Sequence, residues 1–190
     1  MRKGRVIFGE LKHRILELPN VPTTRPTSDA LKEAMFNCLI HRFNIDFKQW
    51  TVIDAFAGSG ALGIETLSLG SSFALFFEQN PVAYRTICKN ISSLNLNNRS
   101  LVLRADVTKY NLNKILPMLG QRILVILDPP YKEVSILNNQ IDRFFNLFHC
   151  KDIVIIAETN SNTTIGNVAP SYVLFTSGNK KAIILSNLKC

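Results

Sequence analysis

The sequence predicts an α/β fold with a mostly parallel sheet, helices on both of its faces and an antiparallel hairpin at one edge. Three observations support this prediction. Short apolar strand patterns alternate with helical patterns from residue 51 onward. The first strand runs directly into a glycine-rich turn, which is typical of ligand-binding α/β domains. The 190 residues are 46% hydrophobic and 19% charged, which indicates one well-filled core and excludes a disordered chain.

The residues before this alternation predict an N-terminal extension. Residues 5–18 predict a basic β-hairpin with its turn at Gly9, and three prolines predict an extended connector after it. The Thr-Ser-Asp run at 27–29 offers capping oxygens for a helix whose apolar residues recur at helical spacing. We therefore expect a hairpin-and-helix extension over residues 1–48 and an α/β domain over residues 49–190.

The α/β domain shows seven strand patterns and four helix patterns. The strands are expected at 51–55, 73–78, 101–105, 122–127, 152–158, 171–176 and 181–186. The helices are expected at 61–69, 81–94, 111–118 and 135–148. Because no helix separates the last two strands, we expect them to form the antiparallel edge of a seven-stranded sheet.

The charge of the chain is concentrated at its N-terminus. The net charge is +8, and the first 25 residues contribute half of it through six Lys and Arg against two Glu. A basic segment attached to a nearly balanced domain is typical of a protein that binds a polyphosphate such as a nucleic acid. A basic face that only keeps a small protein dissolved is the alternative.

Cysteine usage and apolar runs exclude other classes of protein. The cysteines have no paired spacing, which indicates reduced thiols in a cytoplasmic protein and excludes a zinc ribbon or a disulfide framework; they are Cys38, Cys88, Cys150 and Cys190. The apolar runs, such as Ile123–Leu127, fall far short of the ~18 residues that a membrane helix needs. No apolar segment follows the N-terminal charges, so a cleaved secretory signal is not expected.

The glycine-rich turn predicts an adenosine cofactor. Gly58, Gly60 and Gly63 follow the strand 51–55 and satisfy the pattern G-x-G-x-x-G. Glu78 ends the next strand, where its carboxylate can accept hydrogen bonds from both ribose hydroxyls. Read literally, the pattern permits an NAD-linked enzyme, and a tight turn without a ligand is the structural alternative.

Asp54 distinguishes NAD from other adenosine cofactors. A pyrophosphate needs hydrogen-bond donors at this turn, whereas a carboxylate pairs with a cationic amino acid head group. S-adenosylmethionine carries such a head group and a sulfonium, so Asp54 favours it over NAD. Asp106, after the third strand, is placed to accept from the adenine amine, and a turn-capping role is its alternative.

The tetrad Asp128-Pro129-Pro130-Tyr131 follows a buried strand pattern and predicts methylation of an exocyclic amine. The Asp128 carboxylate and the Pro129 carbonyl are two acceptors for the two amine hydrogens, and Tyr131 offers a face on which a displaced base can stack. Accepting both hydrogens stabilises the positive charge that develops on nitrogen as a methyl group arrives. The remaining catalysis is in-line alignment of the reacting atoms. A proline-braced turn is the structural alternative.

Together these motifs resemble the Rossmann-like, S-adenosylmethionine-dependent methyltransferases of exocyclic amines, and most closely the bacterial 16S rRNA guanine-N2 methyltransferase family, RsmD. Residues 5–9 with Arg14 resemble the N-terminal hairpin of that family, and residues 25–29 resemble its R-P-T-x-D signature. Residues 54–65 are similar to its cofactor loop, and residues 128–131 match its catalytic tetrad. The resemblance covers almost the whole chain.

The resemblance implies a Rossmann-like fold, S-adenosylmethionine as the cofactor without a metal, and methylation of a guanine N2 in 16S rRNA or an assembling small subunit. We expect neither a membrane association nor an obligate protein partner. The expected catalytic residues are Asp128, Pro129, Pro130 and Tyr131. The expected cofactor-binding residues are Asp54, Phe56, Gly58, Gly60, Glu78, Asp106 and Asp128. The expected RNA-contacting residues are Arg5, Lys12, Arg14, Arg25, Thr27, Asp29 and Tyr131.

Three positions depart from the family pattern, and three other functions stay open. His13 stands in place of a glycine, Asn80 in place of an acidic residue, and residues 177–179 keep only the glycine of a late motif. The tetrad also occurs in DNA adenine-N6 methyltransferases, and the glycine pattern leaves an NAD-dependent oxidoreductase open. A basic RNA-binding module with a vestigial cofactor fold is the non-enzymatic alternative.

Overall fold

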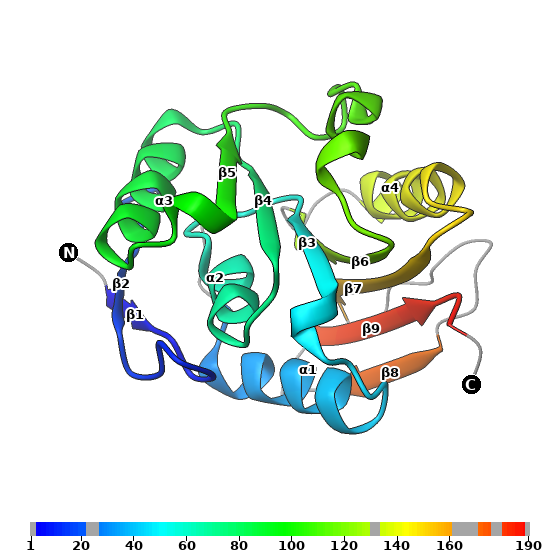
Figure 1. The fold of residues 1–190 in the computed structure, drawn as a ribbon, viewed down its shortest axis with the longest axis horizontal. Coiled ribbons are helices and arrows are strands. Elements are labelled where there is room, and N and C mark those ends of the chain that lie inside the picture. The colour runs from blue at the N-terminus through cyan, green and yellow to red at the C-terminus, as the bar shows by residue number, and fades with distance from the viewer. Residues whose placement is uncertain (1–2, 22–26, 130–133, 161–170, 176–179, 189–190) are drawn as a thin grey trace.

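The computed structural model confirms the α/β fold (Figure 1). The structure describes residues 3–21, 27–129, 134–160, 171–175 and 180–188. Seven strands form one sheet in the order β5-β4-β3-β6-β7-β9-β8, and two further strands form the small sheet β1-β2. The first five strands in that order run parallel, whereas β9 is antiparallel to β7 and to β8. The antiparallel edge predicted from the sequence is therefore confirmed.

The elements follow one another along the chain as strands, α-helices and short 3₁₀ helices, the last written η. They are β1 (Lys3–Arg5), β2 (Ile15–Glu17), α1 (Asp29–His41), η1 (Phe47–Gln49), β3 (Trp50–Asp54), α2 (Ala61–Ser68), β4 (Phe73–Phe77), α3 (Pro81–Ser93), η2 (Asn97–Arg99), β5 (Ser100–Leu103), η3 (Leu112–Met118), β6 (Arg122–Leu127), α4 (Val134–Leu147), β7 (Asp152–Asn160), β8 (Tyr172–Phe175) and β9 (Lys180–Ser186).

Two predicted elements differ from the observed ones. The helix expected at 111–118 is a 3₁₀ helix that contains Pro117, a residue that removes one backbone donor. The N-terminal hairpin pairs only three residues on each side, and a wide loop joins β1 to β2. In that loop Gly9 has φ 74° and His13 has φ 73°, so the histidine occupies a left-handed conformation that glycine adopts more easily. The loop therefore keeps a left-handed residue at position 13, although histidine stands there in place of the glycine of the family pattern.

The large sheet is buried on both faces. Val52 and Phe76 belong to the apolar cluster under α1, α2 and α3, whereas Ile53 and Leu75 belong to the cluster under η3 and α4. Figure 1 shows α1 and α4 on opposite sides of the strands. Burial on both faces explains why the strands are apolar almost throughout and do not alternate with polar residues.

Short polar side chains cap the N-termini of α1 and α3. Ser28 Oγ accepts a hydrogen bond from Leu31 N, 3.2 Å away, at the start of α1. Asn80 Oδ1 accepts from Val82 N and Ala83 N at 2.8 and 3.2 Å, and Pro81 follows at the first position of α3. Asparagine is among the favoured N-cap residues, so Asn80 serves the start of α3 without a negative charge.

The order of the strands reverses at β3, and this reversal marks the expected ligand-binding edge of the sheet. From β3 the chain proceeds to β4 and β5 on one side, and it returns to β6 and β7 on the other. Ligands of open α/β sheets bind outside the carboxyl ends of the strands at such a reversal. No helix in the described part of the chain is long and apolar enough to cross a membrane.

Candidate functional site

The turn after β3 has the geometry of a ligand-binding loop. Gly58 and Gly60 have φ values of 56° and 77°, and Gly60 N donates to Ala57 O at 2.7 Å to close the turn. Gly63 has a different function, because a Cβ on this residue would lie 2.3 Å from the Phe76 ring. Two glycines therefore shape the turn, and the third lets α2 pack closely against β4.

Asp54 is a buried carboxylate at the end of β3. Its side chain is 2% exposed, and its Oδ2 accepts from Gly63 N at 3.0 Å. Burial raises the pKa of Asp54 to about 7; the hydrogen bond from Gly63 opposes the increase, and the nearby charge of Glu78 adds to it. Near neutral pH this group therefore takes up or releases a proton with small changes in its surroundings.

Glu78 follows β4 and reaches across to the same turn. Its Oε2 accepts from Gly58 N at 2.8 Å, and its Oε1 accepts from Asn80 N at 2.7 Å. Burial raises the pKa of Glu78 as well. Two carboxylates, Asp54 and Glu78, thus give the turn a negative potential, which favours a cation and hydroxyl donors and opposes a pyrophosphate.

Asp106 is engaged within its own turn. Its Oδ1 accepts from Thr108 N and Thr108 Oγ1 at 3.0 and 2.7 Å, and its Oδ2 lies 3.6 Å from Lys109 Nζ. These contacts match the turn-capping alternative, and a contact of Asp106 with adenine stays a prediction. Phe56, also expected to bind the cofactor, is half-buried and packs against the cluster under η3 and α4.

The tetrad begins at the carboxyl end of β6. Asp54 pairs with Ile126 in the β3–β6 register, so Asp128 lies two residues further along, at the same edge of the sheet. Asp128 is half-buried and Pro129 is buried. Pro130 and Tyr131 lie outside the described residues. The structure therefore brings Asp54, Glu78 and Asp128 to the ends of three neighbouring strands.

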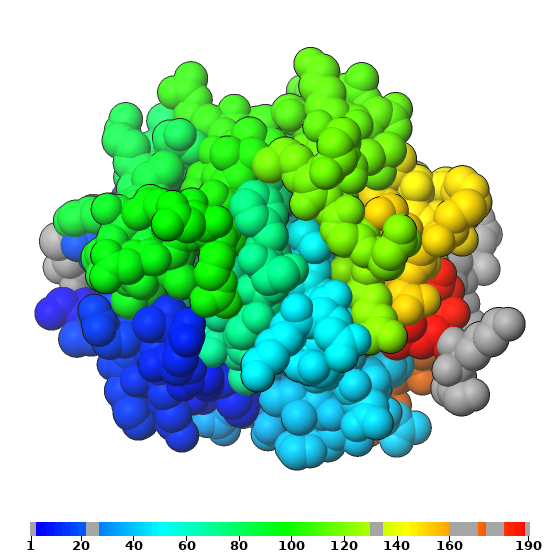
Figure 2. Space-filling view, in the orientation of Figure 1, coloured from blue at the N-terminus to red at the C-terminus, as the bar shows by residue number. Residues whose placement is uncertain are grey.

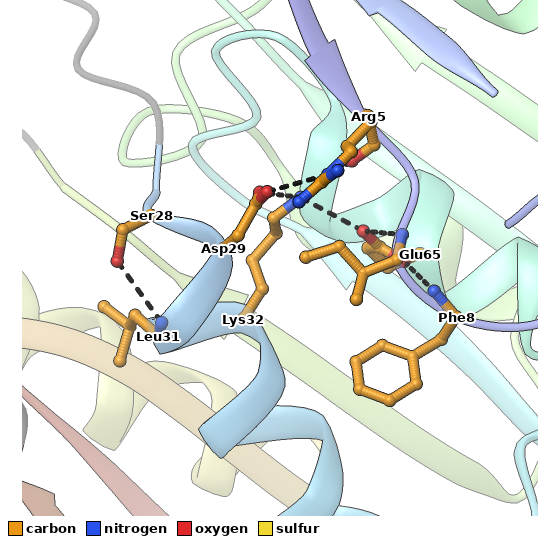
Figure 3. Close-up of polar contacts among 8 residues, drawn as sticks. Arg5, Phe8, Ser28, Asp29, Leu31, Lys32 and Glu65 are labelled. Atoms are coloured by element: carbon orange, nitrogen blue, oxygen red, sulfur yellow. Dashed lines mark hydrogen bonds and ion pairs between the residues drawn. The ribbon is translucent and has the colours of Figure 1, made fainter. Parts of the chain in front are cut away.

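The residues expected to contact RNA lie partly in one polar cluster. Arg5 Nε donates to Asp29 Oδ2 at 3.0 Å, so these two predicted residues pair with each other (Figure 3). Lys12 and Arg14 are exposed, and Thr27 is half-buried. Arg25 lies outside the described residues. RNA contact by this set stays a prediction.

The sequence does not single out four of the buried polar residues, Lys32, Glu65, Asn90 and Glu158. Lys32 and Glu65 form an ion pair at 3.2 Å with side chains 4% and 0% exposed. Asn90 is 2% exposed in α3, and Glu158 is 3% exposed near the carboxyl end of β7. Each is a charged or amide side chain at a buried helix or strand position, and such a residue within an apolar pattern is the signal that could have identified it.

The chain is similar in sequence to a family model and to named proteins of other organisms. The family model described as conserved hypothetical protein 95 matches residues 4–184. A Bacillus subtilis (strain 168) protein with the provisional name rRNA methyltransferase YlbH is 37% identical over 68% of this chain and 67% of its own length. Ribosomal RNA small subunit methyltransferase D of Escherichia coli (strain K12) is 32% identical over 67% of this chain and 60% of its own length. The match thus spans about two thirds of these relatives.

Two solved structures share the fold. A protein of Escherichia coli with the provisional name methyltransferase yhhF superposes with a TM-score of 0.70 at 23% identity, over 97% of this chain and 98% of that chain. The N-terminal domain of human METTL16, solved in complex with SAH, superposes with a TM-score of 0.69 at 14% identity, over 92% of this chain and 76% of that chain. At these identities the likeness supports the fold, and the Rossmann-like architecture expected from the sequence is confirmed.

Proposed function

The chain belongs to the conserved hypothetical protein 95 family, and on this premise we propose that it transfers a methyl group from S-adenosylmethionine to the exocyclic N2 amine of a guanine in small-subunit rRNA. Methylation of rRNA is supported by the names of the relatives, and the cofactor by the carboxylates of the glycine-rich turn. The choice of a guanine N2 rests on the resemblance of the tetrad and of the segment at residues 25–29.

The residues of the glycine-rich turn fit this cofactor. When bound, S-adenosylmethionine supplies an electrophilic methyl group on a sulfonium. Asp54 pairs with the cationic amino group of its methionine part, and Glu78 accepts from the ribose hydroxyls. The observation that carries the proposal is the placement of these two carboxylates beside Asp128 at the point where the strand order reverses. The same negative turn disfavours the NAD alternative.

The tetrad acts on the amine of the base. Asp128 accepts one amine hydrogen, and the carbonyl of Pro129 accepts the other. These hydrogen bonds strengthen as positive charge develops on nitrogen, so they stabilise the transition state more than the bound substrate. Tyr131 holds the displaced base by stacking.

The basic N-terminal segment holds the RNA. Figure 2 shows this segment, in blue, as part of the outer surface beside the residues that follow α3. Arg99, which follows α3, forms an ion pair with Glu10 of this segment at 3.1 Å. The partner is 16S rRNA, free or in an assembling small subunit, and the protein acts in the cytoplasm, where that RNA is found.

One assay tests the proposal directly. The protein is incubated with methyl-labelled S-adenosylmethionine and either deproteinised 16S rRNA, assembled small subunits or duplex DNA. We expect label in N2-methylguanosine from one of the two RNA substrates. Label in N6-methyladenine from DNA would instead establish the adenine alternative, and tighter calorimetric binding of NAD than of S-adenosylhomocysteine would overturn the cofactor assignment.

We also expect Lys12 and Arg14 of the hairpin loop to contact RNA phosphates. Replacing Lys12 and Arg14 with Gln should raise the KM for RNA and leave the Kd for S-adenosylhomocysteine unchanged. The log–log salt slope of RNA binding should become shallower by ~0.7–0.9 for each phosphate that the protein no longer neutralises. Lys48→Gln, an exposed lysine next to the opposite end of β3, is the matched control. An unchanged slope in the double variant would limit these residues to a structural function.

A further inference from the structure

The buried residues that attach the N-terminal hairpin to the cofactor-binding half of the molecule include Glu65 in α2, Asn90 in α3 and Ser68 in α2, whose Oγ accepts from Leu11 N at 2.9 Å. The Glu65 carboxylate accepts from Ile7 N at 2.9 and 3.0 Å and from Phe8 N at 3.1 Å. Lys32 in α1 binds the same carboxylate and also donates to the carbonyl of Arg5 at 2.9 Å (Figure 3). Glu65 belongs to the segment that resembles a cofactor loop, yet its polar contacts are with the hairpin and Lys32.

Asn90 in α3 also touches the cofactor turn itself. Its Oδ1 accepts from Glu17 N at 2.9 Å, and its Nδ2 donates to Glu17 O at 2.9 Å. The same Nδ2 donates to the carbonyl of Ser59 at 3.2 Å. One buried amide therefore joins the last residue of β2 to the residue between Gly58 and Gly60.

Packing reinforces this connection. A Cβ on Gly60 would lie 3.1 Å from Ile87 Cγ2, so α3 supports the turn at two successive residues, Ser59 and Gly60. Because Asn90 and Ile87 lie one turn apart on the same helix face, a displacement of the turn is transmitted to the helix and to the residue that holds β2. Glu65, in contrast, hydrogen-bonds the hairpin and Lys32 but makes no such bond to the turn among the described residues.

We propose that Asn90 is a positioning residue that couples the cofactor turn to the RNA-contacting hairpin. Ordering of the turn by the cofactor fixes the Ser59 carbonyl, and through Asn90 it fixes the end of β2 where the chain leaves toward residues 25–29. The coupling is reciprocal, so whatever orders the hairpin strengthens cofactor binding. RNA contact by the hairpin rests on the function proposed above, whereas the link between turn and hairpin does not.

Two variants separate coupling from simple support. Asn90→Asp keeps the size and the acceptor for Glu17 N, but it replaces the Nδ2 donor with an oxygen that faces two carbonyls. Glu65→Gln keeps the size and one acceptor for the hairpin amides, but it removes the charge opposite Lys32. Both loosen the hairpin, and only the first disturbs the turn.

The readouts are calorimetric binding of S-adenosylhomocysteine and hydrogen exchange of the amides of residues 3–18, with thermal unfolding as a check of folding. In the unaltered protein, the ligand should slow exchange in the hairpin. Asn90→Asp should raise the ligand Kd by about fivefold or more and abolish that slowing. Glu65→Gln should speed hairpin exchange in the free protein but leave the ligand Kd within about twofold.

Two results would contradict the proposed coupling between the turn and the hairpin. A ligand Kd for Asn90→Asp within about twofold of the unaltered value, or hairpin protection that persists in that variant, would overturn the coupling. If Asn90→Asp does not fold, Asn90→Ser, which removes the amide without adding a charge, gives the same comparison. None of these measurements uses RNA, so the failure of the rRNA assignment would be seen in the methylation assay and not here.

Discussion

Asp128→Ala should lower kcat by ~10²–10³-fold while the Kd for S-adenosylhomocysteine changes little. The carboxylate accepts a hydrogen bond that strengthens as charge develops on the amine nitrogen, so its removal raises the barrier more than it weakens binding. Single-turnover methylation of the RNA substrate, measured with saturating cofactor, reports this loss directly. Calorimetry on the same preparations supplies the binding control.

Conservative substitutions at Asp128 and Tyr131 test which property of each side chain is needed. Asp128→Asn keeps an acceptor oxygen but removes the charge, so we expect a loss between those of the unaltered protein and Asp128→Ala. Tyr131→Phe keeps the stacking face and should be tolerated, whereas Tyr131→Ala should weaken capture of the displaced base. Near-normal turnover by Asp128→Ala would remove the tetrad from the mechanism, and a Tyr131→Phe variant as inactive as Tyr131→Ala would give the hydroxyl a direct function.

The affinity for the cofactor should fall about tenfold for each pH unit below about pH 7. Burial raises the pKa of Asp54 to about 7, so this group must lose a proton before it pairs with the cationic amino group of the ligand. Titration of S-adenosylhomocysteine binding between about pH 5.5 and pH 8.5 measures the slope. Asp54→Asn should remove most of the dependence and bind weakly throughout. A flat profile in the unaltered protein would place the amino group elsewhere.

The same group should make the ligand-free protein less stable at alkaline pH. Because the folded-state pKa of Asp54 is raised from 3.8 to about 7, its stabilising contribution is complete below about pH 4 and is lost as the pH rises through about 7. This rise in the pKa corresponds to a loss on the order of 4 kcal/mol in the free energy of unfolding. Asp54→Asn, which keeps the acceptor for Gly63 N, should therefore unfold at higher urea concentration than the unaltered protein at about pH 8. Equal midpoints at that pH would contradict a strongly raised pKa.

Much of the fold could be predicted because its signals are local. Apart from the N-terminal hairpin, the predicted strands and α-helices begin and end within two residues of the observed ones, since apolar period, capping residues and turn glycines act over a few neighbouring positions. The exceptions lie where several weak signals compete. Pro117 shifts one helix to 3₁₀ geometry, and the wide loop around His13 depends on Glu65 and Ser68 of α2.

The sequence by itself determined the order of strands and helices, the glycine turn and the carboxylates at the ends of three strands. Each of these features depends on residues that lie close together in the chain. The tertiary structure alone decided that burial beside Glu78 raises the pKa of Asp54 and that Glu65 and Asn90 hold the hairpin. Those contacts join residues 58 and 73 positions apart, and no local pattern reports such pairs. The energy of a hydrogen bond or an ion pair depends on how completely folding removes water from around the polar groups. The function of such a group is therefore determined only when segments distant in the sequence pack together.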